Sequence, residues 1–403
     1  MKISVVVLFG GKSVEHEVSI ISAVQAMAAM DPDKYEIHPV YITKDNAMYT
    51  SEALKDIGVY TDIPSLLKAT PRASFEVEGT KTYLVSQKSG LFSKPTKALI
   101  DVAFPIVHGT NVEDGALQGF LETINLPYVG PNVLASAVGM DKFVMKVMLD
   151  HGGFPVLKGL RFHRSQADSV GADVEDAFDY PVIVKPVNLG SSVGIGKASD
   201  ADELRQCVDE AFAYSRYILV EPAIVNLREI NCSVVGDAGG AEASECEEPI
   251  MTDAILSYAD KYSGGSKGAK SSPGSKAADS SKGGKSGMAS LKRKIPADIT
   301  DEQREKIRTL AVDAFRYLDL NGVTRVDFLM DANTGEVWIN EVNTIPGSLA
   351  FYLWVPVGVS YPQLLDRLVS LSLKRAREAE DVTYTFDTNI LANARLGAKG
   401  SKG

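Results

Sequence analysis

The strongest constraint on the fold lies in the first 42 residues of the chain. Residues 3–9 are almost all β-branched, aliphatic or aromatic, which predicts a strand buried on both faces of a parallel sheet. Gly10 and Gly11 end this run, and residues 17–30 continue with apolar side chains at helical spacing. A second strand is predicted near residues 36–42. A strand, a glycine turn, a helix and a strand in this order open a doubly wound α/β domain with a parallel sheet.

Length and charge narrow the class of protein. A chain of 403 residues suggests two or three domains, and 45% hydrophobic with 23% charged residues is ordinary for a soluble globular protein. The net charge of −10 argues against a nucleic-acid partner, which would require a basic surface. No apolar run reaches the roughly 18 residues of a membrane span, and Met1 leads into a strand without a signal-peptide pattern. We therefore expect a cytoplasmic protein with no membrane partner, and buried reduced thiols at Cys207, Cys232 and Cys246.

The rest of the chain alternates strands and helices. Residues 263–290 are the exception, because they are almost wholly Gly, Ser, Ala and Lys, which predicts a disordered surface insertion. The lysines of this insertion could attract an anionic partner, but a solvated loop is the simpler interpretation. Further strands are predicted at residues 102–107, 181–185, 217–221 and 229–235, and helices at residues 114–121, 141–151, 202–212 and 301–318.

The sharpest local signal is a hairpin in the last quarter of the chain. Two β-rich runs, residues 322–330 and 336–343, flank a turn of Asp, Asn and Gly residues. If the turn is centred near Thr334, Asp327 lies directly opposite Glu341.

The polar face of this hairpin is a candidate metal site. By the strand period of two, its side chains are Arg325, Asp327, Glu341 and Asn343. Two carboxylates directly opposite each other destabilise a sheet, and a divalent cation between them removes the conflict. Carboxylate and amide oxygens are hard ligands, so we expect Mg²⁺ or Mn²⁺ here. A merely solvated face is the alternative, which the flanking Val, Phe, Ile and Trp residues disfavour.

A loop rich in glycine and serine, residues 189–196, follows the strand that carries Lys185. Exposed backbone N–H groups of such a loop can cradle phosphate groups. Lys142 opens the helix predicted at residues 141–151 and could reach the same anion, although a surface lysine is the ordinary alternative. The loop, the lysines and the acidic hairpin together predict a site for a magnesium nucleotide.

Several motifs of this chain resemble the D-alanine–D-alanine ligases. They occur in family order between residue 2 and about residue 372, at residues 10–19, 108–115, 140–142, 184–194 and 340–347. The resemblance implies an ATP-grasp fold of three α/β domains, with ATP held between the second and the third. It also implies phosphoryl transfer from ATP to one D-alanine, which gives an acyl phosphate. The amine of a second D-alanine then attacks, giving the dipeptide for peptidoglycan.

The same resemblance implies roles for single residues. Catalytic roles fall to Glu15, Ser191, Tyr262, Arg325 and Gly347; Glu15 would hold the first substrate's ammonium, and Arg325 with the Gly347 N–H would stabilise the acyl phosphate and the oxyanion. Contacts with the substrates fall to His108, Lys261, Ser348 and Tyr352. Contacts with ATP fall to Lys142, Lys185, Ser192, Glu221, Ile224 and Glu229. Two Mg²⁺ (or Mn²⁺) ions would be held by Asp327, Glu341 and Asn343.

The resemblance also suggests how the chain divides. We predict an N-terminal α/β substrate domain at residues 1–130 and a central ATP-grasp subdomain at residues 131–217. A C-terminal ATP-grasp subdomain with the metal-binding hairpin follows at residues 218–380, and residues 381–403 form a tail. The family is usually dimeric, which implies a homodimer.

Departures from the family pattern keep other functions open. Ser348 to Tyr352 replace residues usual near the second substrate, so a ligase that joins D-alanine to D-serine, D-lactate or another acceptor is the close alternative. Leu227 and Arg228 precede Glu229 where the family has a glycine pattern, and the insertion follows the lid residues Lys261 and Tyr262. A nucleotide-binding protein that has lost catalysis is the alternative from another class, but such a protein has no need of Arg325.

Overall fold

The first unit of the fold is built on a parallel sheet, as the opening residues predicted. In this computed structural model, which describes residues 2–87, 95–250, 293–385 and 388, the strand order is β3-β2-β1-β7. β1 (Ile3–Gly10) pairs in parallel with β2 (Tyr35–Ile42) and β7 (Val102–Pro105), while the edge strand β3 (Met48–Thr50) is antiparallel. α1 (His16–Ala29) connects β1 to β2 and packs against the sheet. The expected insertion at residues 263–290 and the last fifteen residues of the expected tail lie outside the described residues.

A small antiparallel sheet extends this first unit. Its strands follow the order β4-β5-β6. These residues were not assigned to strands from the sequence, because their alternation is short and largely polar. The strands of this sheet are β4 (Ala73–Glu78), β5 (Lys81–Ser86) and β6 (Thr96–Ile100). The other elements of the first unit are α2 (Ile63–Ala69), α3 (Ala116–Thr123) and the 3₁₀ turns η1 (Glu52–Lys55) and η2 (Ile57–Thr61).

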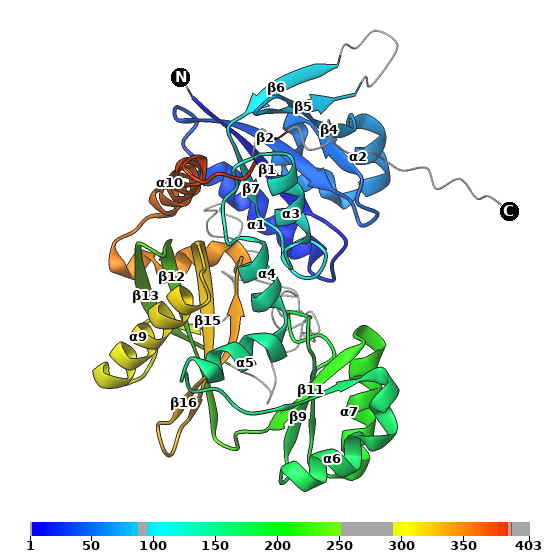
Figure 1. The fold of residues 1–403 in the computed structure, drawn as a ribbon, viewed down its shortest axis with the longest axis vertical. Helices are drawn as coiled ribbons and strands as arrows, with labels where there is room; N and C mark the ends of the chain where they lie inside the picture. Colours follow the sequence, from blue (N-terminus) through cyan, green and yellow to red (C-terminus); the bar gives the residue numbers. More distant parts are fainter. Residues whose placement is uncertain (1, 88–94, 251–292, 386–387, 389–403) are drawn as a thin grey trace, which may run out of the picture.

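The second unit is a four-stranded antiparallel sheet covered by two helices, α6 and α7 (Figure 1). The strand order is β10-β9-β11-β8. The elements are β8 (Leu160–His163), η3 (Arg164–Ser169), α6 (Val170–Ala177), β9 (Val182–Pro186), β10 (Gly196–Ala198), α7 (Ala201–Tyr214) and β11 (Tyr217–Pro222).

The third unit is a five-stranded antiparallel sheet of order β14-β13-β12-β15-β16. The predicted hairpin forms its edge, with β15 and β16 joined by the Asp-Asn-Gly turn. The elements are β12 (Leu227–Asp237), β13 (Gly240–Pro249), β14 (Arg293–Lys294), α9 (Asp301–Tyr317), β15 (Gly322–Asp331), β16 (Val337–Asn343), η5 (Gly347–Leu353), η6 (Val355–Val357) and α10 (Tyr361–Glu380), and the preceding helices α4 (Val133–Met140) and α5 (Lys142–His151) pack on this sheet.

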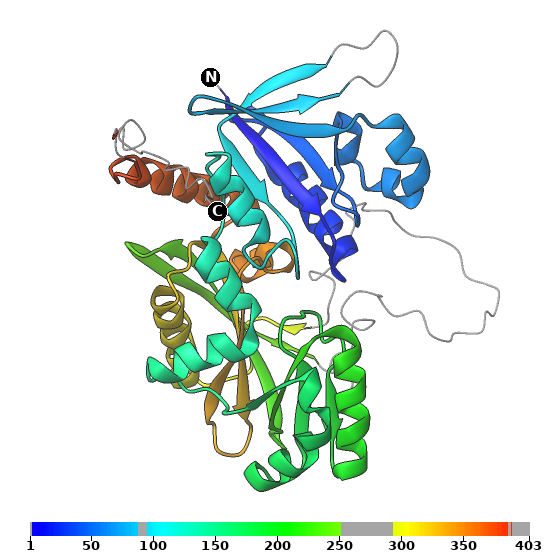
Figure 2. The same ribbon diagram turned by 45° about the vertical axis from the view of Figure 1, so that its right-hand side comes forward.

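Three hydrophobic cores hold these units. The predicted domain boundaries remain predictions. Two segments, however, pack into the core of a different unit from the one to which the sequence assigned them. α4 and α5, placed with the second unit from the sequence, bury Met145 and Leu149 in the core of the third sheet. α10 returns to the first core, where Leu365 and Leu368 are buried and the helix contacts β7 and α1. Figure 2 shows α10 beside the N-terminal unit, and it also contacts β12 and β15 of the third sheet, so it lies between the two units.

The expectation of buried thiols is confirmed for two of the three cysteines. Cys232 and Cys246 are fully buried on neighbouring strands, Cys207 is half-buried, and none forms a disulfide.

Candidate active site

The hairpin of β15 and β16 supplies the acidic wall of the site. Asp327 pairs directly with Glu341 across the two strands, which confirms the predicted register, and a bulge follows at Asp327 and Phe328. Asn343 Nδ2 donates to Asp327 Oδ2 over 2.9 Å. The three predicted metal ligands therefore lie together at one edge of the third sheet.

Arg325 is the buried cation of this wall. Its Nε and Nη2 atoms donate to the two carboxylate oxygens of Asp327 over 2.6 and 2.7 Å. Burial alone would lower the pKa of Arg325, but the Asp327 carboxylate raises that pKa above its usual value. Arg325 therefore carries its charge throughout the physiological range and holds Asp327 in place.

The donor set of this wall fits a hard divalent cation. Asp327 and Glu341 offer carboxylate oxygens, and Asn343 offers an amide oxygen, which are the atoms that Mg²⁺ and Mn²⁺ prefer. The guanidinium of Arg325 already brings one positive charge against these acids. Among the residues that the structure describes, no three His, Cys, Asp or Glu side chains gather as a metal site, and this hairpin offers two carboxylates and one amide.

α5 presents two lysines to the site. The Asp141 side chain caps the helix by accepting two backbone N–H groups, so Lys142 is the first helical residue, as predicted. Lys142 Nζ donates to the Leu189 carbonyl over 2.6 Å and lies 3.4 Å from a carboxylate oxygen of Glu341. Lys146 lies one helical turn further along the same face.

Glu221 on β11 is buried between two lysines. It forms ion pairs with Lys146 and Lys185, and Lys185 Nζ also donates to Asn340 Oδ1 over 3.1 Å. Burial alone would raise the pKa of Glu221, but the two lysines lower it. Burial lowers the pKa of Lys146 to about 8 even though Glu221 opposes that change. The carboxylate therefore stays ionised and holds both ammonium groups, of which that of Lys185 lines the second cavity.

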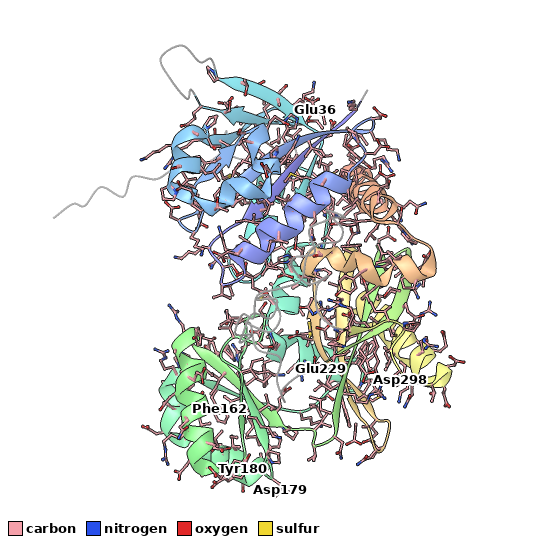
Figure 3. The ribbon with its side chains drawn as sticks, turned by 180° about the vertical axis from the view of Figure 1, so that it is seen from behind. Glu36, Phe162, Asp179, Tyr180, Glu229 and Asp298 are labelled. Atoms are coloured by element: carbon pink, nitrogen blue, oxygen red, sulfur yellow. The ribbon has the colours of Figure 1, made fainter. Side chains whose placement is uncertain are left out.

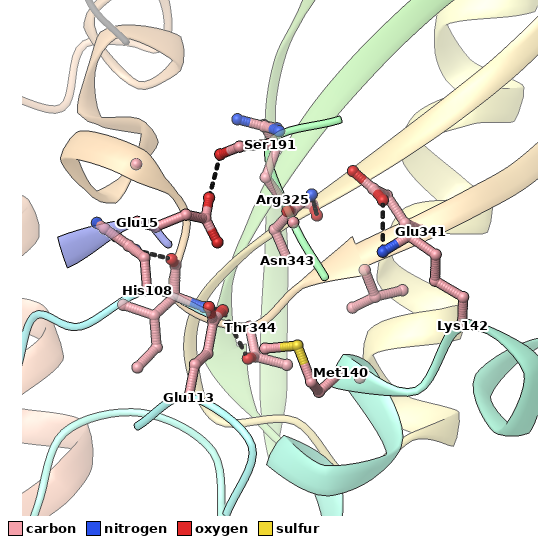
Figure 4. A pocket seen from close by; sticks show the side chains of 15 residues that line it. Glu15, His108, Glu113, Met140, Lys142, Ser191, Arg325, Glu341, Asn343 and Thr344 are labelled. Atoms are coloured by element: carbon pink, nitrogen blue, oxygen red, sulfur yellow. Dashed lines mark hydrogen bonds and ion pairs between the residues drawn. The ribbon is translucent and has the colours of Figure 1, made fainter. Parts of the chain in front are cut away.

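The glycine-rich loop between β9 and β10 reaches across to the first unit. Ser191 Oγ donates to Glu15, a contact visible in Figure 4. A Cβ on Gly190 would lie 2.5 Å from Glu15 Oε2, so a larger residue here would displace the Glu15 carboxylate from its present position. Ser191 and Ser192 adopt left-handed backbone conformations, with φ of 54° and 58°. This contact closes one side of the site.

The loop after β7 contributes two buried polar groups, His108 and Glu113. His108 Nδ1 donates to the Ile345 carbonyl over 2.8 Å, which fixes a neutral tautomer, and burial lowers the pKa of His108 to about 4. Burial, and then the nearby Glu15, raise the pKa of Glu113 to about 7. His108 therefore meets its neighbours as a neutral imidazole.

Two adjoining cavities bring the predicted residues together, and they share Lys142 and Glu341. Of the predicted residues, the first cavity (Figure 4) is lined by Glu15, His108, Ser191, Arg325, Asn343 and Gly347. The second, of about 240 Å³, is lined by Lys185, Ser192, Glu221, Ile224, Glu229 and Asp327. Glu229 lies between the second unit, marked by Phe162, and the outer edge of the third, marked by Asp298 (Figure 3).

Four predicted substrate and catalytic residues are not placed at these cavities. Ser348 and Tyr352 line neither: Ser348 Oγ donates to Gln25 Oε1 over 2.9 Å, and Tyr352 donates to Glu247 Oε1 over 3.2 Å. Their substrate contacts stay predictions. Lys261 and Tyr262 lie outside the described residues.

Two residues of the site were not assigned roles from the sequence. Lys146 follows Lys142 by four positions, so the helical period could have placed both on one face. Glu113 lies within a motif that matched the family, but its partners, Thr344 and Ile345, are more than 200 residues away and nothing local indicates them.

The fold and site define a class. Two antiparallel sheets enclose a lysine-lined cavity with an acidic hairpin at its wall, and this is the ATP-grasp architecture. The family model described as "D-ala D-ala ligase N-terminus" matches residues 4–131, and "D-ala D-ala ligase C-terminus" matches residues 143–283 and 281–370. The chain belongs to the D-alanine–D-alanine ligase family.

Individual relatives agree with this assignment. The chain is 39% identical to a D-alanine–D-alanine ligase of Geobacillus thermodenitrificans, over 96% of this chain and 100% of the relative. The structure of the D-alanine–D-alanine ligase from Coxiella burnetii is similar with a TM-score of 0.75 and 30% identity, covering 94% of this chain and 96% of that one. The VanG D-Ala:D-Ser ligase of Enterococcus faecalis has a TM-score of 0.73 and 27% identity, covering 92% and 100%.

Among the described residues, no helix combines the length and the apolar character needed to cross a bilayer.

Proposed function

We propose that this protein joins two D-alanine molecules at the expense of ATP, through a D-alanyl phosphate. The observation that carries the proposal is the pair of adjoining cavities that share Lys142 and Glu341. One cavity has the lysines and the apolar strand residues suited to a nucleotide, and the other has the acid and the arginine suited to an amino acid. The membership of the chain in the ligase family supports the same reading.

The nucleotide side would hold ATP by charge and shape. Lys142 and Lys185 end at the acidic wall, where phosphate groups would replace part of their present pairing. Ile224 and the Glu221 strand would flank the adenine, Glu229 would accept from the ribose, and Ser192 would meet the phosphates with the loop N–H groups.

The metal ligands of this proposal are Asp327, Glu341 and Asn343, with two Mg²⁺ or Mn²⁺ ions. When bound, these ions would supply positive charge that offsets the triphosphate. The chain's own part is to keep the three donors on one face through the β15–β16 register and the grip of Arg325 on Asp327.

The amino-acid side would orient the first D-alanine. Glu15 would accept its ammonium, while Ser191 and His108 complete that wall. The γ-phosphoryl group of ATP passes to a carboxylate oxygen, giving D-alanyl phosphate and ADP. The amine of the second D-alanine then attacks the carbonyl carbon, phosphate leaves, and the amine loses a proton. Arg325 and the Gly347 N–H would stabilise the negative charge that develops on the oxygens.

The setting follows from the product. A D-alanyl-D-alanine ligase would serve peptidoglycan synthesis from the cytoplasm, where ATP is available, and we propose a homodimer. Lys261 and Tyr262, outside the described residues, would complete the site.

The experiment measures phosphate release and dipeptide formation with ATP, Mg²⁺ and a panel of D-alanine, D-serine and D-lactate. We expect D-alanyl-D-alanine as the main product, with D-serine accepted within about 100-fold, because an apolar pocket rejects an added hydroxyl only weakly. ATP turnover without dipeptide, or a preference for D-lactate at pH 7, would contradict the proposal.

Tyr352 needs its own comparison, because its ring lies 3.9 Å from the Arg293 guanidinium and not at a cavity wall. Tyr352→Phe removes only the phenolic hydroxyl, whereas Tyr352→Ser removes the ring. A change in the acceptor ranking with Tyr352→Ser alone would show that the ring limits the acceptor pocket. An unchanged ranking in both variants would assign Tyr352 to packing with Glu247 and Arg293.

A further inference from the structure

The segment that carries Gly347 leaves the end of β16 and enters a strained turn. Ser348, Leu349 and Ala350 all have left-handed backbone conformations, with φ of 51°, 52° and 48°. Side chains disfavour this conformation, so three successive residues keep it only where the surroundings hold them. Gly347 lies at the start of this turn and lines the cavity beside Arg325.

The first anchor of this segment is the buried Glu113 carboxylate. Its Oε1 atom accepts from the Ile345 N–H over 2.8 Å and from Thr344 Oγ1 over 3.0 Å. Its Oε2 atom accepts from the Gly109 N–H over 2.8 Å. One carboxylate therefore ties the loop after β7 to the backbone two residues before Gly347.

The second anchor is the hydroxyl of Ser22 on α1, which is 1% exposed. The Ser348 N–H, one residue after Gly347, donates to Ser22 Oγ over 3.0 Å. Since His108 Nδ1 donates to the Ile345 carbonyl, its Nε2 atom must accept, and Ser22 Oγ donates to it over 3.0 Å. The chain of bonds runs from Ser348 through Ser22 and His108 back to Ile345.

These two anchors hold the backbone on both sides of the Gly347 amide, and both come from the first unit of the fold. A donor that stabilises a developing oxyanion is effective only at the right position, because a misplaced N–H loses most of its benefit. We propose that Ser22 and Glu113 are positioning residues that fix the Gly347 amide for the transition state. This inference rests on the proposed ligase function and adds to it two residues that act through the backbone on either side of Gly347.

Alternative roles are less consistent with the geometry. Ser22 lines neither cavity, and its hydroxyl bonds to His108 and to the Ser348 N–H. Glu113 does line the first cavity, but both of its carboxylate oxygens already accept hydrogen bonds, from the Gly109 N–H, the Ile345 N–H and the Thr344 hydroxyl. A role in fold stability alone would make the two residues independent of turnover. The experiment separates these cases.

The test compares Ser22→Ala and Glu113→Gln with Thr82→Val. Thr82 is also buried and its hydroxyl donates to a backbone carbonyl, that of Ile124, but it lies in the small sheet of the first unit. We expect kcat for dipeptide formation to fall about 10- to 100-fold in Ser22→Ala and Glu113→Gln, less than for loss of an oxyanion donor. KM for ATP should stay within about twofold of wild type, because neither residue lines the nucleotide cavity. Thr82→Val should keep the wild-type kcat.

The kcat of a double variant, Ser22→Ala with Glu113→Gln, distinguishes positioning of one shared amide from two separate structural roles. If both residues act through one amide, the kcat of the double variant should lie near that of the less active single variant, since the effects of residues that act as a unit are not additive. Faster hydrogen exchange of the Ser348 amide in Ser22→Ala would support the same mechanism. If Ser22→Ala does not fold, Glu113→Gln, which keeps the side-chain size, gives the same kcat comparison.

The outcomes are distinct. Wild-type kcat in both single variants, or a loss equal to that in Thr82→Val, would overturn the inference and leave the ligase function standing. Multiplied losses in the double variant would also overturn it. Wild-type protein that makes no dipeptide would overturn the proposed function and the inference with it.

Discussion

Glu341 is the residue on which the two cavities converge. It faces Asp327 across the hairpin and lies 3.4 Å from Lys142. We predict that Glu341→Gln lowers kcat by about 100-fold or more, since even residues that only support a ligand cost 10- to 100-fold. The measurement is kcat against Mg²⁺ concentration.

The control for this substitution lies in the same hairpin. Glu336→Gln makes the identical change at an exposed position beside the turn and should leave turnover unchanged. Wild-type kcat with an ordinary Mg²⁺ dependence in Glu341→Gln would contradict the metal assignment.

Glu113 and His108 make opposite contributions to the pH dependence of stability. The pKa of Glu113 rises to about 7 through burial and Glu15, so the folded state binds more protons than the unfolded one between about pH 4.5 and 7, and stability falls as pH rises. The pKa of His108 falls to about 4 through burial, so stability rises with pH between about 4 and 6.5. In wild type these two contributions largely cancel.

Glu113→Gln should leave the contribution of His108 to the pH dependence of stability without the opposing contribution of Glu113. We predict that the free energy of unfolding of this variant increases by about 3 kcal/mol from pH 4.5 to pH 7 relative to wild type, as the 2.5-unit rise in the pKa of Glu113 implies. Urea unfolding at several pH values gives the measurement. Parallel curves for the two proteins would show that Glu113 titrates normally.

At the scale of elements, the turn after β16 is held against its backbone preference. Ala350 is fully buried and has φ of 48°, which costs an L-residue about 1–2 kcal/mol. Glycine pays no such cost. We predict that Ala350→Gly is neutral or slightly stabilising, whereas Ala311→Gly, at an equally buried position inside α9, destabilises by about 1 kcal/mol or more.

The two alanines differ only in backbone conformation, so their comparison isolates strain. The measurement is the urea midpoint of each variant at one pH. Equal destabilisation in both variants would show that the left-handed turn carries no strain.

Elements also show how far local pattern predicts structure. Strand alternation and the Asp-Asn-Gly turn were enough to predict the hairpin and its Asp327–Glu341 register. The same reasoning missed β13, which pairs with the neighbouring β12 but is rich in small and acidic residues, and α10, which packs against distant segments. The strand predicted at residues 102–107 ends at Pro105, because the chain leaves the ladder there for the His108 loop.

At the scale of the whole molecule, the nucleotide cavity lies between two separate cores. Residues of the second unit, such as Lys185, and of the third, such as Asp327, line it together. We predict that a non-hydrolysable ATP analogue with Mg²⁺ raises the free energy of unfolding by about 2.7 kcal/mol at 100 times its Kd. Thermal unfolding with increasing ligand gives the measurement.

Substitutions of two lysines, one at the cavity and one at the surface, provide the control for this prediction. Lys142→Met should reduce the ligand-induced shift, while Lys44→Met, which breaks an exposed pair with Glu17, should keep it. An equal shift in both variants would remove Lys142 from the nucleotide site.

The sequence by itself determined the features that are encoded within a few neighbouring residues. These are the opening strand and helix, the hairpin with its opposed carboxylates, and the position of Lys142 at a helix start, since alternation, capping and turn chemistry act over short distances. Tertiary structure alone decided which segments meet. Glu113 reaches Thr344 across 231 positions, and Ser191 reaches Glu15 across 176. Such contacts depend on how three cores pack together, and no local pattern of side chains specifies that packing.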